Sequence, residues 1–225
     1  MKTAILVDGG YYRKVAMKAF GIKSPKDAAN ELYTYCFKHL DEKYALKNNI
    51  KHDLYRIFYY DCPPLESNVY NPITKEQEFF GKNETGKWMK EFLKELTMKR
   101  KVALRLGELL TYETKYLLNP QSLNKLIDKE ITIEDLTTND IFLSTRQKGV
   151  DMKIGVDIAS LSLKKQVDQI VLIAGDSDFV PAAKLARREG IDFVLDPLGR
   201  KVKDNLFEHI DGLRSCDKRL KPNKK

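Results

Sequence analysis

The side chains best suited to chemistry in this sequence are carboxylates that follow apolar runs. The run at residues 3–7 leads into Asp8, and the run at residues 169–174 leads into Asp176 and Asp178, which a single serine separates. In open parallel sheets, ligands bind beyond the carboxyl ends of the strands. If both runs are strands of such a sheet, the three acids meet at one edge, and the glycines beside them let backbone or ligand approach closely.

Three aspartates at one edge would raise one another's pKa and cost stability unless a cation neutralised them. Hard divalent cations such as Mg²⁺ or Mn²⁺ prefer oxygen ligands of this kind. A simpler explanation covers part of the pattern, since Asp-Gly is common in turns and Asp178 is placed to cap the helix that follows. Capping accounts for neither Asp176 nor the repeat of the pattern at Asp8, so we predict a metal site.

A helix predicted at residues 150–164 supplies further acids. Asp151 stands at its start after a glycine, where it is free to point back toward the strand ends or to cap the helix. Asp157 lies about 120° away around the helix at ~100° per residue, and an i, i+4 pair with Lys153 is its simpler role. We therefore rank Asp151 above Asp157 as a site residue.

The same helix carries two apolar stripes on opposite sides. A peripheral helix needs only one such stripe, so the pattern predicts a helix that is covered on both sides. The two stripes are Val150, Ile154, Ile158 and Leu161, and Met152, Val156, Ala159 and Leu163.

Strand and helix patterns alternate along the chain, and the strands are near-continuous apolar runs. This is typical of an α/β protein with a parallel sheet and helices on both faces. We expect strands at residues 3–7, 52–61, 102–112, 169–174 and 191–195, and helices at 11–20, 27–46, 88–98, 150–164, 178–189 and 202–210. We predict a single domain over 1–212 with surface insertions at about 63–85 and 113–147, the second holding one short helix.

The charge of the chain is basic, with 40 Lys and Arg against 32 Asp and Glu, or +8. Much of the excess lies in a predicted basic tail at 213–225, where six basic residues accompany one acid. On charge alone, a solvated and frayed terminus is the simpler interpretation. The alternative interpretation is a basic arm that attracts the phosphate backbone of a nucleic acid.

The composition limits the class of protein and the cellular compartment that we expect. A hydrophobic fraction of 42% excludes wholesale disorder. Cys36, Cys62 and Cys216 are far apart and form no C-x-x-C pair, which favours reduced thiols in a cytoplasmic protein over disulfides or a structural zinc. No apolar run reaches the ~18 residues of a membrane-spanning helix, and the first residues contain no cleavage-like segment. We therefore expect no membrane partner.

Three motifs, taken in order, resemble the NYN domain family, which is related to the PIN nucleases. They are Val-Asp-Gly-Gly at 7–10, Lys-Gly-Val-Asp-x-x-x-x-x-Asp at 148–157 and Gly-Asp-Ser-Asp-Phe at 175–179. The resemblance implies a Rossmann-like PIN-type fold and a metal-dependent ribonuclease. Its catalytic and metal-binding acids would be Asp8, Asp151, Asp176 and Asp178, with Asp157 a further matched position. Many members have an asparagine just after the first Asp-Gly pair, where this chain has Gly10-Tyr11.

The chemistry that this resemblance implies is hydrolysis of RNA, with Mg²⁺ or Mn²⁺ activating a water and stabilising the leaving oxygen. DNA is left open as a substrate. Tyr11 is a candidate to stack on unpaired bases, although a packed helix start explains it equally well. Lys148 is a candidate phosphate contact and Ser177 a candidate contact to a metal-bound water or the scissile phosphate, although a solvated lysine and a turn serine are simpler roles.

The main rival is a catalytically silent RNA-binding or regulatory protein of the same fold. The presence of every matched acid favours the nuclease, and the two insertions suit either a substrate clamp or a partner surface. Phosphatases of the haloacid-dehalogenase type are excluded because Gly10, not an acid, stands two positions after Asp8. Phosphate-cradling and dinucleotide-binding glycine motifs are absent from the sequence. Related folds often pair, so a homo-oligomer is compatible with the resemblance.

Overall fold

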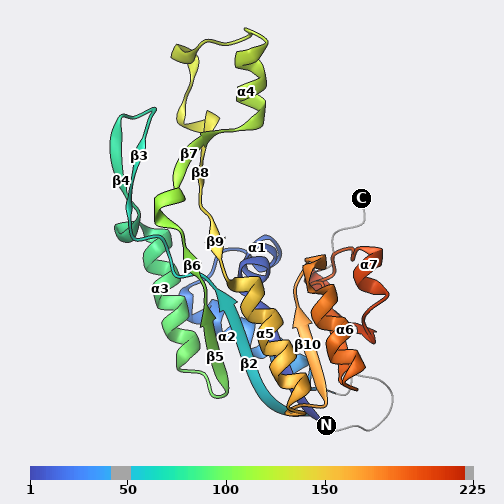
Figure 1. Ribbon diagram of the computed structural model, residues 1–225. Helices are drawn as coiled ribbons and strands as arrows, with labels where there is room; N and C mark the ends of the chain where they lie inside the picture. Colours follow the sequence, from blue (N-terminus) through green and yellow to red (C-terminus); the bar gives the residue numbers. More distant parts are fainter. Residues whose placement is uncertain (42–51, 221–225) are drawn as a thin grey trace. The chain divides into compact units, whose positions relative to one another are not determined.

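The computed structural model describes residues 1–41 and 52–220, and its main sheet has six parallel strands (Figure 1). These strands are β1 (Lys2–Asp8), β2 (Asp53–Asp61), β5 (Val102–Leu106), β10 (Gln169–Ile173), β11 (Asp192–Asp196) and β12 (Gly212–Leu213). Their order across the sheet is β12-β11-β10-β1-β2-β5. Because β1 and β10 are parallel neighbours, their carboxyl ends lie at the same edge.

The central strands are apolar because both of their faces are covered. All five residues of β10 are buried, and the segment from Ala4 to Val7 in β1 has no exposed surface. Burial of such runs is the main favourable contribution to folding, at roughly 25 cal/mol per Å² of apolar surface. The strands therefore form a rigid platform that fixes whatever follows their carboxyl ends.

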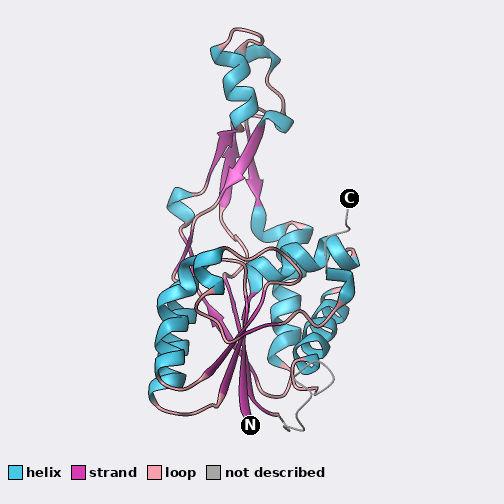
Figure 2. Ribbon diagram, turned by 90° about the vertical axis from the view of Figure 1, so that its right-hand side faces the viewer, coloured by secondary structure: helices cyan, strands magenta, loops and turns pink. Residues whose placement is uncertain are grey.

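Helices cover both faces of this sheet, as Figure 2 shows. Successive residues of β2 point to opposite faces. The Tyr59 ring packs edge-on against Phe92 of α3 (Glu84–Thr97), whereas the Tyr60 hydroxyl donates to Asp157 of α5 (Val150–Leu163). Helices α1 (Gly9–Phe20) and α2 (Pro25–Lys38) lie on the Tyr59 face, and α6 (Val180–Arg188) lies beside α5 on the other. The predicted parallel sheet with helices on both faces is confirmed.

Helix α5 is covered on one side only. The first predicted stripe is buried, since Val150, Ile154, Ile158 and Leu161 face the sheet with at most 8% of their surface exposed. The second is not, because Met152 is 74% exposed, Val156 60% and Leu163 59%. The prediction that both sides are covered is wrong, since the sheet supplies one wall for α5 and no element of the described residues covers the opposite side of these three residues.

The chain divides into two compact units. The first comprises Met1–Cys62, Glu91–Gly107 and Gly149–Lys225, and contains the six-stranded sheet. The second comprises Pro63–Lys90 and Glu108–Lys148, and the unit boundary falls within α3. The insertions predicted at about 63–85 and 113–147 lie in the second unit.

Antiparallel strand pairs and one short helix, α4 (Pro120–Ile127), make up most of the second unit. The pairs are β3 (Asn68–Asn71) with β4 (Glu76–Phe79), β7 (Lys115–Leu118) with β8 (Ile141–Ser144), and β6 (Glu108–Leu109) with β9 (Gln147–Lys148). The sequence predicts none of these pairs, because strands of four residues or fewer carry too little alternation of apolar and polar residues. The strand predicted at 102–112 is likewise two strands, β5 and β6, on either side of Gly107.

Two predicted helices are shorter than expected. The helix expected at 27–46 is α2, which ends at Lys38, and residues 42–46 lie outside the described residues. The helix expected at 202–210 is reduced to α7 (Asp204–Phe207). Within the ranges 1–41 and 52–220, no helix is both long enough and apolar enough to cross a membrane.

The start of the predicted basic tail is part of the first unit. Residues 212–213 form β12 beside β11, and Cys216 and Leu220 are buried. Asp217 forms ion pairs with Arg219, in the 3-10 turn η6 (Lys218–Leu220), and with Lys38 of α2, which offsets part of the basic charge. A tail beginning at 213 is therefore wrong for residues 213–220, and residues 221–225 lie outside the described part of the chain.

Candidate active site

Three of the predicted acids stand at the carboxyl ends of neighbouring strands in the first unit, and a fourth stands at the start of a helix. Asp8 is the last residue of β1, and β1 is paired with β10 through Val7 and Ile173. Asp176 and Asp178 stand in the turn after β10, around the 3-10 turn η5 (Ser177–Phe179). Asp151 lies in the first turn of α5. The sheet thus brings together acids that lie up to 170 positions apart in the sequence.

Asp8 is the most buried of these four acids. Its Oδ1 accepts a hydrogen bond from the Tyr11 N–H at 3.0 Å, which caps helix α1. The pKa of Asp8 is raised to about 6, mainly by burial and to a smaller extent by the negative charges of Asp151 and Asp61, against the lowering effect of the backbone hydrogen bonds. The carboxylate is therefore fixed in place and costly to ionise.

Asp151, Asp176 and Asp178 are exposed. The pKa of Asp151 is raised first by loss of hydration and then by the charges of Asp176 and Asp178, so these three acids are near enough to repel one another. The cap of α5 is Gly149 at φ +83°, a conformation that favours glycine, so Asp151 is not the capping residue. Asp176 accepts from the Asp178 N–H at 3.2 Å.

Metal-ligand geometry is not preformed at this edge. Among residues 1–41 and 52–220, no three His, Cys, Asp or Glu side chains lie in an arrangement that could hold a metal ion. What the four acids share is a donor type, carboxylate oxygen, and a mutual repulsion expressed in the raised pKa of Asp8 and Asp151. That donor set fits a hard divalent cation.

Two further strand-end aspartates, which the sequence did not single out, have hydrogen-bonding or ionic partners within the protein. Asp61, the last residue of β2, is buried and forms a paired contact with Arg13, Nε to Oδ2 at 3.0 Å and Nη2 to Oδ1 at 3.1 Å. The Tyr59 hydroxyl also donates to it at 2.8 Å. Its position at a strand end is visible in the sequence, but its partner in α1 is not.

Asp196, the last residue of β11, has no exposed surface. It accepts hydrogen bonds from the Tyr35 hydroxyl, the Ser215 hydroxyl at 2.6 Å and the Leu198 N–H at 2.7 Å. His39 Nε2 lies 3.0 Å from its Oδ2. This network fixes the loop that follows β11, so Asp196 serves the structure rather than the candidate site.

Asp157 is likewise bound to its own neighbours. Its Oδ2 accepts from the Tyr60 hydroxyl at 2.8 Å and from Arg105 Nε at 3.0 Å. The expected pair with Lys153 is absent, since the Lys153 ammonium donates to the Leu106 carbonyl. We therefore leave Asp157 out of the candidate site.

The glycines beside the acids make room for the protein's own side chains. A Cβ at Gly9 would collide with the Tyr59 hydroxyl and Asp61, and a Cβ at Gly175 would collide with the Tyr11 ring. The Tyr11 hydroxyl donates to the Pro197 carbonyl at 2.6 Å, and burial raises its pKa to about 12. Tyr11 therefore ties α1 to the loop after β11, across Gly175, and its ring is not free to stack on a base.

The other two predicted substrate contacts, Lys148 and Ser177, belong to different units of the chain. Lys148 is exposed in β9 of the second unit, opposite Glu108 in the β6–β9 pair. Ser177 lies in η5, between Asp176 and Asp178, and its hydroxyl accepts from the Lys203 ammonium at 3.3 Å. Lys203 was not predicted, although it follows the strand end at Asp196 within a basic run, Arg200-Lys201-Val202-Lys203.

Comparison with known proteins agrees with the fold and with the family that the motifs resemble. The NYN domain family matches residues 90–203, which is half of the chain and includes Asp151, Asp176 and Asp178 but not Asp8. The chain belongs to the NYN domain family, within the PIN-like nuclease superfamily.

Two other comparisons add nothing about function. Curated proteins gave no match. A protein of unknown function from Vibrio parahaemolyticus has a similar crystal structure at 13% sequence identity, with 97% of this chain and 94% of that chain covered and a TM-score of 0.46.

The close approach at Gly175 predicts a position-specific cost. Gly175→Ala should lower the free energy of unfolding by roughly 1–3 kcal/mol, because its Cβ displaces the Tyr11 ring. Gly155→Ala in α5 is the matched control, since a Cβ there meets nothing within 4 Å and alanine favours a helix by up to about 1 kcal/mol. Urea denaturation measures both. Equal effects of the two substitutions would contradict the packing described for Tyr11.

The burial of Asp8 predicts a pH-dependent cost of ionisation. Its pKa in the folded protein, about 6, exceeds the ordinary 3.8, so the folded state loses stability as pH rises from about 4 to 6. Asn at this position keeps the oxygen that caps Tyr11 N–H and carries no charge. In EDTA, Asp8→Asn should therefore be more stable than the parent by roughly 1–3 kcal/mol at pH 7.5 and equal to it below pH 4. A gain that does not change with pH would exclude burial of the charge as its source.

Proposed function

We propose that this NYN-domain protein is a metal-dependent ribonuclease that hydrolyses phosphodiester bonds at Asp8, Asp151, Asp176 and Asp178. One observation carries the proposal. The strand-end acids Asp61 and Asp196 have internal partners that compensate them, whereas these four acids have no cationic partner among the residues described. Acids placed together at a cost in stability are candidates for a function that requires their charge.

Mg²⁺ or Mn²⁺ is the cofactor that this donor set suits, with the four carboxylates as its holders. When bound, a divalent cation supplies charge compensation and Lewis acidity toward phosphate oxygens. Its binding would also relieve the repulsion that raises the pKa of Asp8 and Asp151.

The chain's own groups prepare the site for hydrolysis. Backbone N–H groups of Tyr11 and Asp178 orient one oxygen each of Asp8 and Asp176. In the reaction, a water oxygen forms a bond to phosphorus, the bond to the leaving ribose oxygen breaks, and the proton released by water ends on that oxygen or in solvent. Pre-oriented carboxylates lower the reorganisation required as charge develops.

Lys203 brings a positive charge to the turn that follows β10. Its ammonium reaches the Ser177 hydroxyl, on the turn that carries Asp176 and Asp178, and it forms no ion pair in the described part of the chain. We infer that Lys203 contacts a phosphate of the bound strand. The Asp196 network holds the preceding loop, through Leu198 N–H and through Ser215, which also accepts from Gly199 N–H.

A second candidate function is binding of RNA without cleavage. It is favoured by the absence, among residues 1–41 and 52–220, of three side chains already arranged as metal ligands. The same carboxylate edge would then be a remnant, and Lys203 would serve binding alone.

Cleavage of labelled single-stranded RNA, with DNA in parallel, separates these two functions. With Mn²⁺ or Mg²⁺ the parent should cut RNA, EDTA should stop it, and Asp176→Asn should lower kcat by roughly 100-fold or more. Asp157→Asn is the matched control, because Asn still accepts from Tyr60 and Arg105, and its rate should stay within about 3-fold of the parent. RNA that is bound equally by parent and Asp176→Asn but cut by neither would establish the silent binder.

The role of Lys203 predicts a salt-dependent loss of affinity. Lys203→Ala should weaken RNA binding by roughly 3- to 10-fold at low salt and reduce the slope of log affinity against log salt by about 1. Lys18→Ala removes the same charge from an exposed position in the last turn of α1, at the end opposite Asp8, and should change neither quantity. Fluorescence anisotropy across a salt series measures both. Identical behaviour of the two variants would show that net charge alone matters.

A further inference from the structure

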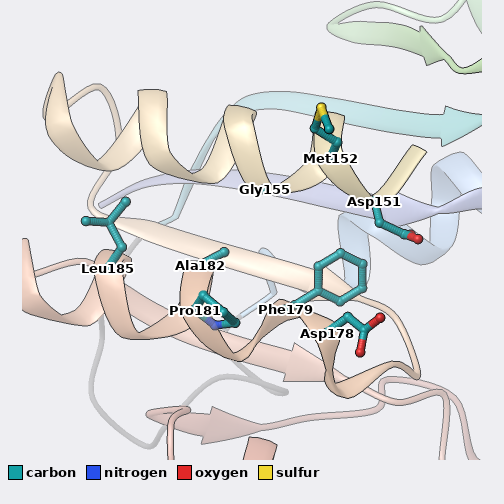
Figure 3. Close-up of a pocket in the computed structure, with 8 residues that line it drawn as sticks. All are labelled: Asp151, Met152, Gly155, Asp178, Phe179, Pro181, Ala182 and Leu185. Carbon is teal, nitrogen blue, oxygen red and sulfur yellow. The ribbon is translucent and has the colours of Figure 1, made fainter. Parts of the chain in front are cut away.

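A pocket of about 420 Å³ opens between α5 and α6, directly beside two of the acids (Figure 3). Asp151 and Asp178 stand at one end, and Leu185 lies at the other. Both helices begin at the acid end, so the pocket runs along them away from the carboxylates. Its volume is in the range of small-ligand sites.

The walls of this pocket are apolar. Phe179 is buried between the helices and forms the inner surface, whereas Met152 is 74% exposed at the rim. Pro181 and Leu185 complete the α6 side. Apart from the two acids, no lining side chain donates or accepts a hydrogen bond, so the pocket suits a flat, weakly polar group without selecting among hydrogen-bonding patterns.

We propose that this pocket receives an unpaired base of the nucleotide next to the scissile phosphate. The inference rests on the proposed function, because Asp151 and Asp178 belong both to the pocket and to the proposed catalytic edge. A phosphate at those acids places the adjoining base within reach of Met152 and Phe179. The Met152 thioether at the rim attracts a base through sulfur–aromatic contacts, and Phe179, which is 2% exposed, forms the apolar floor of the pocket.

Duplex RNA is not expected to place a base in this pocket. A paired base is stacked inside its helix, and extruding it costs a few kcal/mol, least where the nucleotide is already single-stranded. Because the lining lacks donors and acceptors for base edges, sequence preference should be weak.

Gly155 allows the pocket to be filled without disturbing the protein. It lines the pocket in the second turn of α5, and a Cβ built there meets nothing within 4 Å. Gly155→Leu therefore places a side chain in the pocket while improving helix propensity. Val156→Leu is the matched control, since Val156 is the next residue of α5, is 60% exposed and does not line the pocket.

The test measures binding of an eight-nucleotide RNA in Mg²⁺ by the non-cleaving Asp176→Asn protein. Adding Gly155→Leu should weaken binding of the single strand by roughly 5- to 100-fold, as expected for one lost base stack. Affinity for the same sequence as a duplex, and the effect of Val156→Leu, should stay within about 2-fold. Met152→Ala, a change at an exposed side chain, should lower single-strand affinity in the same direction and serves if Gly155→Leu fails to fold.

An abasic scan of the same RNA makes the assignment specific. Removing the base at one position should reproduce the loss caused by Gly155→Leu, and that abasic RNA should bind the Gly155→Leu protein no more weakly than the intact RNA does. Unchanged affinity in Gly155→Leu and Met152→Ala, or equal losses for single strand and duplex, would overturn the proposal. A shift in sedimentation without a change in RNA affinity would also overturn it, and would assign the pocket to contacts between copies of the chain.

Failure of the base-pocket proposal and failure of the nuclease proposal give different experimental results. A parent protein that cuts RNA while Gly155→Leu cuts and binds normally rejects the base pocket alone. A parent protein that cuts nothing, but whose single-strand affinity depends on Gly155 and on one base, rejects catalysis alone.

Discussion

Crowding of negative charge at the carboxyl edge of one parallel sheet is the constraint around which this protein is organised. The strands β1, β2 and β11 each end in aspartate, and β10 leads into two more. Asp61 is compensated by Arg13, and Asp196 by hydroxyl, imidazole and backbone groups. Asp8 and Asp151 instead keep raised pKa values, caused by burial and by the acids near them. Two acids of this edge therefore have compensating partners within the protein, whereas Asp8, Asp151, Asp176 and Asp178 have no cationic partner among the described residues.

Internal compensation also holds the edge in shape. The pair between Arg13 and Asp61 ties α1 to β2, and it requires a glycine at position 9 because any Cβ would strike Tyr59 or Asp61. Tyr11 crosses Gly175 to reach the Pro197 carbonyl, which links the turn after β10 to the loop after β11. The structural aspartates thus position the backbone that carries the uncompensated ones. Aspartates at the same edge therefore differ in role, because some have partners within the protein and others do not.

Helix α5 shows how one element joins scaffold and site. Its inner stripe packs on the sheet, and Asp157 anchors its middle to Tyr60 and Arg105, so that its first turn presents Asp151 at the acid edge. Its outer stripe, with Met152, is left open beside α6. If a divalent cation offsets the carboxylates, an exposed apolar surface continuous with that edge suits a nucleotide, which is apolar on its base and anionic on its phosphate.

The sequence by itself determined the alternation of strands and helices, the parallel sheet and the four acids at its edge, because buried parallel strands are continuous apolar runs that end where polar residues begin. Only the tertiary structure decided which aspartates are compensated, since Arg13 and Asp61, or His39 and Asp196, are 48 and 157 positions apart. It also decided that Tyr11 packs against Gly175, that Lys203 stands beside Ser177, and that one apolar stripe of α5 is exposed. The spacing of apolar residues shows that a helix face is apolar. Whether another element covers that face depends on packing between distant segments, which no local pattern encodes.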